Sequence, residues 1–255
     1  MSKAQTSWGE VAGWYDNVVE SDDSYQTQVI LPNLLRLMTL SKAQDVLDIA
    51  CGQGFFSRAF HQAGATVTGI DIGENLIKIA QEKSSKEIEF LLGSAEELKE
   101  IPDGSFDKAS IVLALQNIEH MQKALQSASR ILRKDGKLYI VLNHPAFRIP
   151  DKSLWGFDEE KEIQYRRVDG YISESKKEMI MNPGIVDEAR QIKTISFHRP
   201  LQVYAKALFK AGFAITRLEE WTSHKESEPG PREKAENKAR KEFPMFMTLE
   251  CSKVV

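Results

Sequence analysis

Cysteine is scarce in this chain of 255 residues, and Cys51 and Cys251 stand far apart. Two cysteines do not form a disulfide framework, and neither belongs to a Cys-x-x-Cys pair of the kind that holds zinc. His, Asp and Glu also do not cluster at the spacing of metal ligands. We therefore expect neither a disulfide-stabilised fold nor a metal site.

Long apolar runs are missing as well. No stretch of about 18 apolar residues occurs, which argues against a transmembrane helix. Residues 1–11 lack the apolar segment of a signal peptide. We expect a cytoplasmic protein with no membrane partner.

Neither sign of charge is in large excess, since 34 basic and 37 acidic side chains give a formal net charge of −3. Proteins that bind phosphate backbones are usually clearly basic, so nucleic acid is not expected as a partner. The charge is unevenly divided, with −5 over residues 1–145 and +2 over residues 146–255. An anionic ligand would therefore meet the second part of the chain.

Short apolar runs alternate with helical stretches through the first 145 residues. Apolar residues recur at helical spacing over residues 55–63 and 121–132, for example. Such alternation predicts an α/β fold with a mainly parallel, doubly wound sheet. The predicted strands cover residues 45–50, 66–70, 88–92, 108–114 and 137–142, and two last strands cover 213–221 and 245–251.

The regular alternation of strands and helices stops after the fifth predicted strand. Residues 145–199 hold three prolines and several aromatic residues, and we expect short antiparallel strands near 164–172 and 178–181. Helices are predicted over residues 25–40, where Pro32 must start or kink the helix, and over 201–211. A charged helix is expected to begin near Pro231. The predicted units are a core (1–144), a lid (145–199) and a C-terminal completion of the core sheet (200–255).

The most informative segment is VLDIACGQGFFSR, residues 46–58. A strand ends in Asp48, a tight turn with Gly52 and Gly54 follows, and a helix begins. Glycines let the backbone approach a ligand closely, and such a turn opens a pocket at the carboxyl edge of the sheet. Asp71 ends the next strand, where a carboxylate can accept hydrogen bonds from both hydroxyls of a ribose.

A Gly-x-Gly turn also suits a nicotinamide dinucleotide, but two details argue against that cofactor. Ser57 stands where the dinucleotide motif has its third glycine. Asp48 would repel a pyrophosphate, whereas it would attract the amino group of an amino-acid-like ligand. A nicotinamide oxidoreductase is therefore the least favoured alternative.

With these residues the sequence resembles the class I S-adenosylmethionine (SAM) dependent methyltransferases, over residues 8–143 and the last strands. The resemblance implies a Rossmann-like seven-stranded sheet of order 3-2-1-4-5-7-6, in which the final strand is antiparallel. It also implies a small lid inserted after the fifth strand. SAM would be the cofactor and S-adenosylhomocysteine (SAH) the product.

The resemblance also assigns cofactor contacts. The turn after Asp48 would hold the methionine part of SAM, Asp71 the ribose and Ile72 the adenine. Ser94 stands where the family often has an aspartate that receives the adenine amino group, and its hydroxyl can still form a hydrogen bond there. The residues expected to bind the cofactor are Tyr15, Asp48, Ala50, Gly52, Gln53, Gly54, Asp71, Ile72, Ser94, Ala95, Leu113 and Gln116.

The acceptor site is expected beyond the fifth strand. Asn143 and His144 follow that strand on the cofactor side and are the candidate catalytic residues, because a methyl acceptor can need a general base. Substrate choice would lie in the lid, where aromatic and arginine side chains suit a planar or carboxylate-bearing acceptor. The candidate substrate-binding residues are Trp155, Tyr165, Arg167, Tyr171 and His198.

The function that these observations predict is methyl transfer from SAM to a small molecule. Because the sulfonium already provides a good leaving group, catalysis would rest mainly on positioning and desolvation. Two alternatives stay open. One is a nucleic-acid or protein methyltransferase, and the other is a protein that binds SAM without transferring its methyl group.

Overall fold

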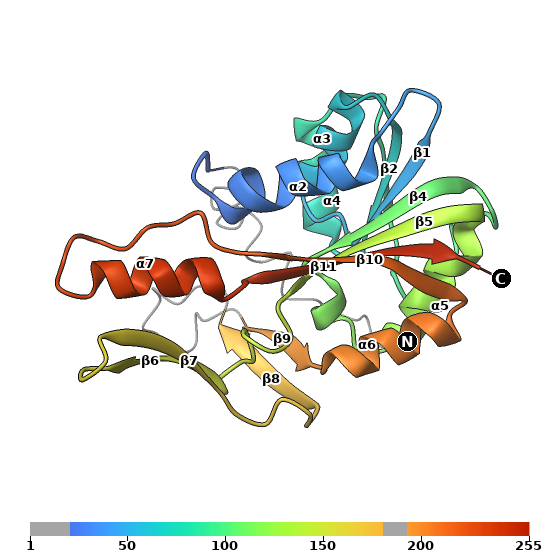
Figure 1. Cartoon of the computed structure of the whole chain (residues 1–255). Helices are drawn as coiled ribbons and strands as arrows, with labels where there is room; N and C mark the ends of the chain where they lie inside the picture. The colour runs from blue at the N-terminus through green and yellow to red at the C-terminus, as the bar shows by residue number, and fades with distance from the viewer. Residues whose placement is uncertain (1–20, 181–192, 255) are drawn as a thin grey trace.

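The computed structural model describes residues 21–180 and 193–254. Its centre is a seven-stranded sheet of order β3-β2-β1-β4-β5-β11-β10, with helices on both faces (Figure 1). β11 and β10 occupy the places of the seventh and sixth strands, so the predicted α/β fold and strand order are confirmed. The prediction of three units stays untested.

The strands are mostly parallel. β11 (Phe246–Lys253) runs antiparallel to both of its neighbours, β5 and β10 (Phe213–Trp221), as expected for the final strand. The other five strands pair in parallel, so their carboxyl ends meet at one edge of the sheet. They are β1 (Asp45–Ile49), β2 (Thr66–Asp71), β3 (Glu89–Leu92), β4 (Phe106–Val112) and β5 (Leu132–Asn143).

The helices predicted over residues 55–63, 121–132 and 201–211 lie close to their expected positions. The helices between the strands are α3 (Phe55–Gln62), α4 (Glu74–Lys83) and α5 (Met121–Ile131), with α6 (Leu201–Lys210) before β10. The helix predicted over 25–40 is divided into a π-helical turn, η2 (Gln26–Ile30), and α2 (Leu31–Met38). Pro32 stands in the first turn of α2, where a missing N–H is tolerated.

Two apolar clusters bury the two faces of the sheet. Successive strand residues point to opposite faces, so Leu47 joins the cluster beneath α5 and α6 while Val46 joins the cluster beneath α2 and α3. β1 is consequently buried at four successive positions. This explains why the central strands are near-continuous apolar runs in the sequence rather than alternating ones.

The lid differs from the prediction. It contains two hairpins, β6 (Ser153–Asp158) with β7 (Ile163–Val168), and β8 (Ser175–Ile180) with β9 (Lys193–His198). The strand expected near 164–172 ends at Val168, and β6 and β9 were not anticipated. These strands are half exposed and polar, so they lack the apolar signal by which the core strands were found.

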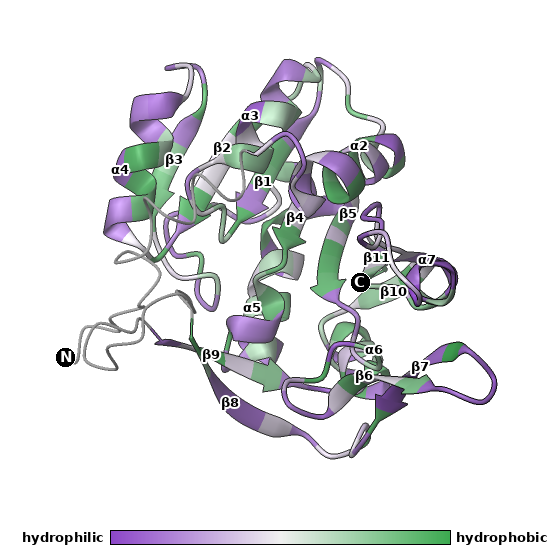
Figure 2. Cartoon of the chain, turned by 90° about the vertical axis from the view of Figure 1, so that its left-hand side faces the viewer, coloured by the Kyte–Doolittle hydropathy of each residue, from purple (hydrophilic) through white to green (hydrophobic). Residues whose placement is uncertain are grey.

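Both hairpins and the charged helix α7 (Glu233–Glu242) lie toward the carboxyl ends of the parallel strands (Figures 1 and 2). A short 3-10 turn, η3 (Leu115–Asn117), follows β4 at the same edge and contacts β9. The edge that carries the glycine turn therefore also carries the lid. Among the described residues, no helix is long and apolar enough to cross a membrane.

Candidate cofactor and acceptor site

The turn between β1 and α3 is sharp because its backbone is left-handed at several residues. The φ angles of Ala50, Gly52 and Gly54 are 57°, 58° and 81°. A Cβ atom on Gly54 would lie 2.8 Å from the Phe90 ring, so this position needs glycine for space as well as for φ. A Cβ atom on Gly52 would meet nothing within 4 Å, so open space adjoins the turn there.

Asp71 ties this turn to the end of β2. Its Oδ2 accepts a hydrogen bond from the backbone N–H of Gly52 at 2.9 Å, and its Oδ1 accepts one from Gly73 at 2.7 Å. Burial raises the pKa of Asp71, although both backbone N–H groups oppose that shift. A carboxylate has about four lone-pair sites, so each oxygen keeps the capacity to accept a ribose hydroxyl.

Asp48 is more deeply placed than the sequence suggests. Only 2% of the residue is exposed, and its two oxygens accept hydrogen bonds from Ser57 (2.7 Å) and Ser110 (3.0 Å). Burial raises the pKa of Asp48 to about 6, with the two serine hydroxyls opposing the shift. Asp48 therefore lies beneath the turn, where both of its oxygens are already engaged by serine hydroxyls.

Two buried amide atoms at the same edge have no hydrogen-bond partner in the described part of the chain. They are Nε2 of Gln53, in the glycine turn, and Oε1 of Gln116, in η3. Buried polar atoms of this kind are normally paired, so unpaired ones indicate a polar ligand. Together with Asp71 and the open space at Gly52, they fit the cofactor that the resemblance implies.

The remaining cofactor candidates are distributed along this edge. Ile72 is 41% exposed, which suits an apolar surface against a base. The Ser94 hydroxyl accepts a hydrogen bond from the Glu96 backbone, and Ala95 packs on the core below. Leu113 has a left-handed backbone, with φ of 53°, and its carbonyl accepts a hydrogen bond from Gln116. Tyr15 lies outside the described residues.

The two catalytic candidates are both engaged in hydrogen bonds. Nε2 of His144 lies 2.6 Å from Glu220, and Nδ1 accepts hydrogen bonds from the backbone N–H groups of Ala146 and Phe147. An Nδ1 that accepts leaves Nε2 as the protonated nitrogen of the neutral ring. His144 thus holds the chain after β5 in place. Asn143 accepts a hydrogen bond from Arg148 through Oδ1, at 2.6 Å.

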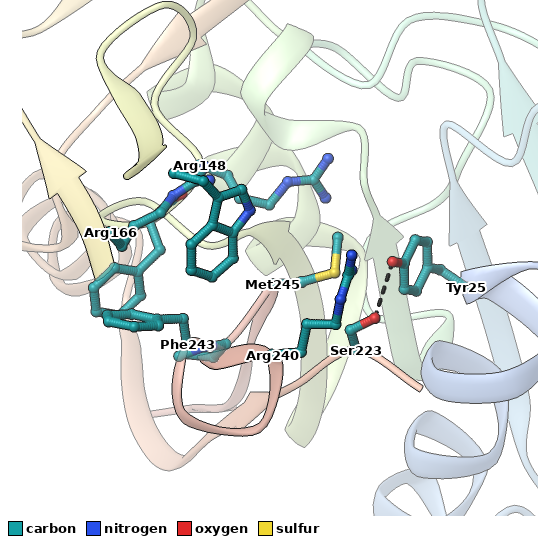
Figure 3. A pocket seen from close by; sticks show the side chains of 10 residues that line it. Tyr25, Arg148, Arg166, Ser223, Arg240, Phe243 and Met245 are labelled. Carbon is teal, nitrogen blue, oxygen red and sulfur yellow. Dashed lines mark hydrogen bonds between the residues drawn. The ribbon is translucent and has the colours of Figure 1, made fainter. Parts of the chain in front are cut away.

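A cavity of about 100 Å³ opens between the lid and the core sheet (Figure 3). Of the five substrate candidates, only Trp155 lines it. The Trp155 ring lies under the Arg166 guanidinium, 4.8 Å away, and against Phe243 at 5.5 Å. The full lining is Tyr25, Phe147, Arg148, Trp155, Arg166, Ser223, Arg240, Phe243, Pro244 and Met245.

The other lid candidates are not brought to this cavity. Tyr165 and Arg167 flank Arg166 on β7, so their side chains point to the opposite face of the hairpin. Tyr171 and His198 brace the start of α6 instead. The Tyr171 hydroxyl accepts a hydrogen bond from Leu201 N–H, and its carbonyl lies 2.8 Å from Nε2 of His198.

The candidates chosen from the sequence include only Trp155 of this lining, although Arg148 and Arg166 belong to the aromatic and arginine residues of the lid from which those candidates were drawn. Arg148, Arg166, Arg240 and Phe243 come from the chain after β5, from β7 and from the end of α7. One part of the lining could have been found from the sequence. Successive residues of a strand point to opposite faces, and directly paired residues share a face, so Arg166, which pairs with Trp155, lies on the same face of the hairpin as Trp155. No local sequence pattern predicts that α7 packs on this hairpin.

The chain matches the family model described as a methyltransferase domain over residues 47–140. It is 30% identical over 141 residues to the demethylmenaquinone methyltransferase of Paenarthrobacter aurescens, which is 55% of each chain. It is 32% identical over 98 residues to a ubiquinone biosynthesis O-methyltransferase of Xanthomonas oryzae, which is 37% of this chain and 41% of that one. The chain thus spans about half the length of these relatives or less.

Among solved structures, a SAM-dependent methyltransferase from Mesorhizobium loti is 25% identical, with a TM-score of 0.67. The likeness covers 86% of this chain and 96% of that chain. Together with the glycine turn and the strand order, these matches show that the chain carries a methyltransferase domain with the class I methyltransferase fold.

Proposed function

We propose that this protein transfers the methyl group of SAM to a small-molecule acceptor. The observation that carries the proposal is the set of groups around the glycine turn: Asp71 tied to Gly52, the buried Asp48, and the unpaired amides of Gln53 and Gln116. They stand inside the region that matches the methyltransferase family. Bound SAM would supply a methyl group activated by a neighbouring sulfonium.

The charge at this edge supports a cationic cofactor. Asp48 and Asp71 are both buried carboxylates, and each raises the cost of a second negative charge nearby. A pyrophosphate would add to that cost, whereas a sulfonium and an ammonium group would reduce it. The same residues therefore argue against a nicotinamide dinucleotide.

A small-molecule acceptor is supported by the relatives whose names concern quinone precursors. The family match ends at residue 140, before the lid, so the identity of the acceptor does not transfer with it. The finer proposal is an aromatic or carboxylate-bearing acceptor, because aromatic rings and arginines line the cavity beneath the lid. That cavity also favours an enzyme over a protein that only binds SAM.

The residues of the chain would act by positioning the acceptor and excluding water. The lid hairpin and α7 close over the cavity, and His144 fixes the chain between β5 and the lid. A general-base role for His144 or Asn143 stays a prediction. It would require either side chain to leave the hydrogen bonds that it makes with Glu220, the 146–147 backbone or Arg148.

Titration calorimetry with SAM, SAH and NADH tests the cofactor. We expect SAM and SAH to bind in about the micromolar range, a free energy near −8 kcal/mol, and NADH to show no binding. Binding of NADH alone would overturn the proposal. Release of SAH from SAM in the presence of a panel of aromatic acids then tests transfer. SAM binding without SAH release from any acceptor class would favour the non-catalytic alternative.

A further inference from the structure

The cavity beneath the lid concentrates positive charge that has no partner. Arg148, Arg166 and Arg240 line it, and none of the ten lining residues is acidic. Within the described residues, no carboxylate lies within 4.0 Å of these three guanidinium groups. Six other arginines of the described part of the chain form ion pairs, as Arg167 does with Asp169 at 2.9 Å, whereas Arg199 donates to backbone carbonyls. A cluster of cations without counter-charges indicates a missing anion.

The hydrogen bonds that the three arginines donate go to neutral groups rather than to carboxylates, although Arg240 also borders a second pocket whose lining includes four glutamates. Arg166 donates to the Phe147 carbonyl (2.7 Å and 3.0 Å) and to Ser153. Arg148 donates to Asn143, and Arg240 donates through Nε to Ser227 at 3.0 Å. Burial lowers the pKa of Arg166, so holding its charge here costs free energy.

The geometry directs these charges into one space. In Figure 3, Arg148 and Arg240 extend toward the middle of the cavity, between Phe243 and Tyr25. Trp155 and Phe243, packed edge to face at 5.5 Å, form an aromatic wall. Arginine forks match the oxygens of a carboxylate or phosphate, and aromatic walls suit a planar ring. A cavity of about 100 Å³ has room for an anionic group with part of its ring.

The cavity is separate from the glycine turn along the sheet edge. It adjoins the end of β5 and the start of β11, whereas Asp71 ends β2. β2 and β11 are four strand steps apart in the sheet, or about 19 Å at a spacing of about 4.8 Å per step. The acidic groups of the cofactor region and the arginines of the cavity therefore form two neighbouring sites of opposite charge.

We infer that Arg148, Arg166 and Arg240 form a binding site for the anionic group, a carboxylate or phosphate, of an aromatic methyl acceptor. The inference rests on the proposed function, because it assigns the anion to the molecule that receives the methyl group. It narrows the acceptor to a molecule that is both aromatic and anionic, and it names the residues that recognise the anionic group. The +2 net charge of residues 146–255 agrees with this location.

The test is binding of benzoate, phenyl phosphate and neutral benzamide, measured by ligand-observed NMR on the full chain saturated with SAH. We expect at least one of the two anions to bind, benzamide not to compete, and the preferred anion to identify the acidic group. Arg166→Gln and Arg240→Gln should each weaken that binding about tenfold or more, the effect of losing a hydrogen bond from a charged donor.

Two matched controls keep the charge change but lie outside the cavity. Arg167→Gln alters the next residue of β7, which is paired with Asp169, and Arg232→Gln alters the start of α7, where the side chain is paired with Glu159. Both should bind the anion as the natural chain does. If Arg166→Gln loosens the hairpin that it braces, Arg240→Gln still tests the site from another element.

Three results would overturn the inference. Benzamide could bind as well as the anions, or the control variants could lose as much anion affinity as Arg166→Gln and Arg240→Gln. Arg240→Gln could also lose SAH affinity in parallel, which would assign the anion to the cofactor. The proposed function fails separately. SAH binding without anion binding refutes the arginine site alone, and anion binding without SAH binding refutes the proposed function.

Discussion

The Gly52 N–H donates a hydrogen bond to Asp71 Oδ2 at 2.9 Å, and this bond joins the glycine turn after β1 to the end of β2. Asp71 thereby shapes the turn as well as offering oxygens to a ribose. A substitution of Asp71 consequently affects the cofactor site in two ways, and the choice of variant has to separate them.

Asp71→Asn keeps the size of the side chain and one acceptor oxygen but removes the charge. We expect SAM affinity to fall by about 1–3 kcal/mol, the scale of a lost charged hydrogen-bond partner. Calorimetry with SAM measures the change, and Asp103→Asn, at an exposed surface ion pair with Arg130, is the control. Unchanged SAM affinity in Asp71→Asn would contradict the proposal that Asp71 binds the ribose of SAM.

Asp48 makes stability depend on pH in a direction opposite to that of a salt-bridged carboxylate. Its pKa is about 6 in the folded chain against an ordinary value of 3.8, so the folded state holds the proton more tightly. The free energy of unfolding should therefore fall by roughly 3 kcal/mol in total as pH rises from about 4 to 6. Above pH 6 it should be constant. Asp48→Asn should lack this decline.

Urea unfolding of the natural chain and of Asp48→Asn across that pH range gives the measurement. The difference between the two chains isolates Asp48 from other groups, such as His144, whose pKa burial lowers.

A cationic cofactor should favour the ionised carboxylate of Asp48. SAM should therefore also bind more tightly above pH 6 than below it, and only in the natural chain. A pH-independent difference in stability would contradict the buried, proton-holding state of Asp48.

His144 is expected to support the fold. His144→Ala leaves the backbone N–H groups of Ala146 and Phe147 without their acceptor, at a cost of about 1–3 kcal/mol in the free energy of unfolding. His144→Asn, which can still accept, should lose less. Thermal or urea unfolding measures both, with the more exposed His61→Ala as control. Equal stability of all three variants would show that His144 does not support the fold through these hydrogen bonds.

Trp155 and Tyr165 should separate in their effects, although both lie in the lid. Trp155→Ala removes the ring beneath Arg166 and should weaken binding of an aromatic acid at least severalfold while leaving SAH affinity unchanged. Tyr165→Ala, on the other face of the hairpin, should change neither. NMR titration with benzoate and calorimetry with SAH provide the two measurements. Loss of both affinities in Trp155→Ala would make the lid purely structural.

The core of the fold was predictable because its signals are local. The apolar runs around Leu47 and Ile111 are long because a parallel sheet is buried on both faces, and the helices between them show their own periodicity. The lid strands were predicted poorly, since β7 and β8 are half exposed and polar. Asp48 was placed correctly along the chain, but its burial beneath the turn was not foreseen.

By itself the sequence determined the core strands, the glycine turn and the two carboxylates at or near the ends of β1 and β2, because each depends on residues a few positions apart. The strand order came from the resemblance to the methyltransferase family, and the tertiary structure confirmed it. Only the tertiary structure decided that Arg166 rather than Arg167 faces the cavity, and that Arg148 and Arg240 join it there. The physical reason is that a cavity wall is assembled by packing between distant segments. The face that a strand residue presents is set by its pleat, and the neighbours of that face are set by how α7 and the hairpin dock.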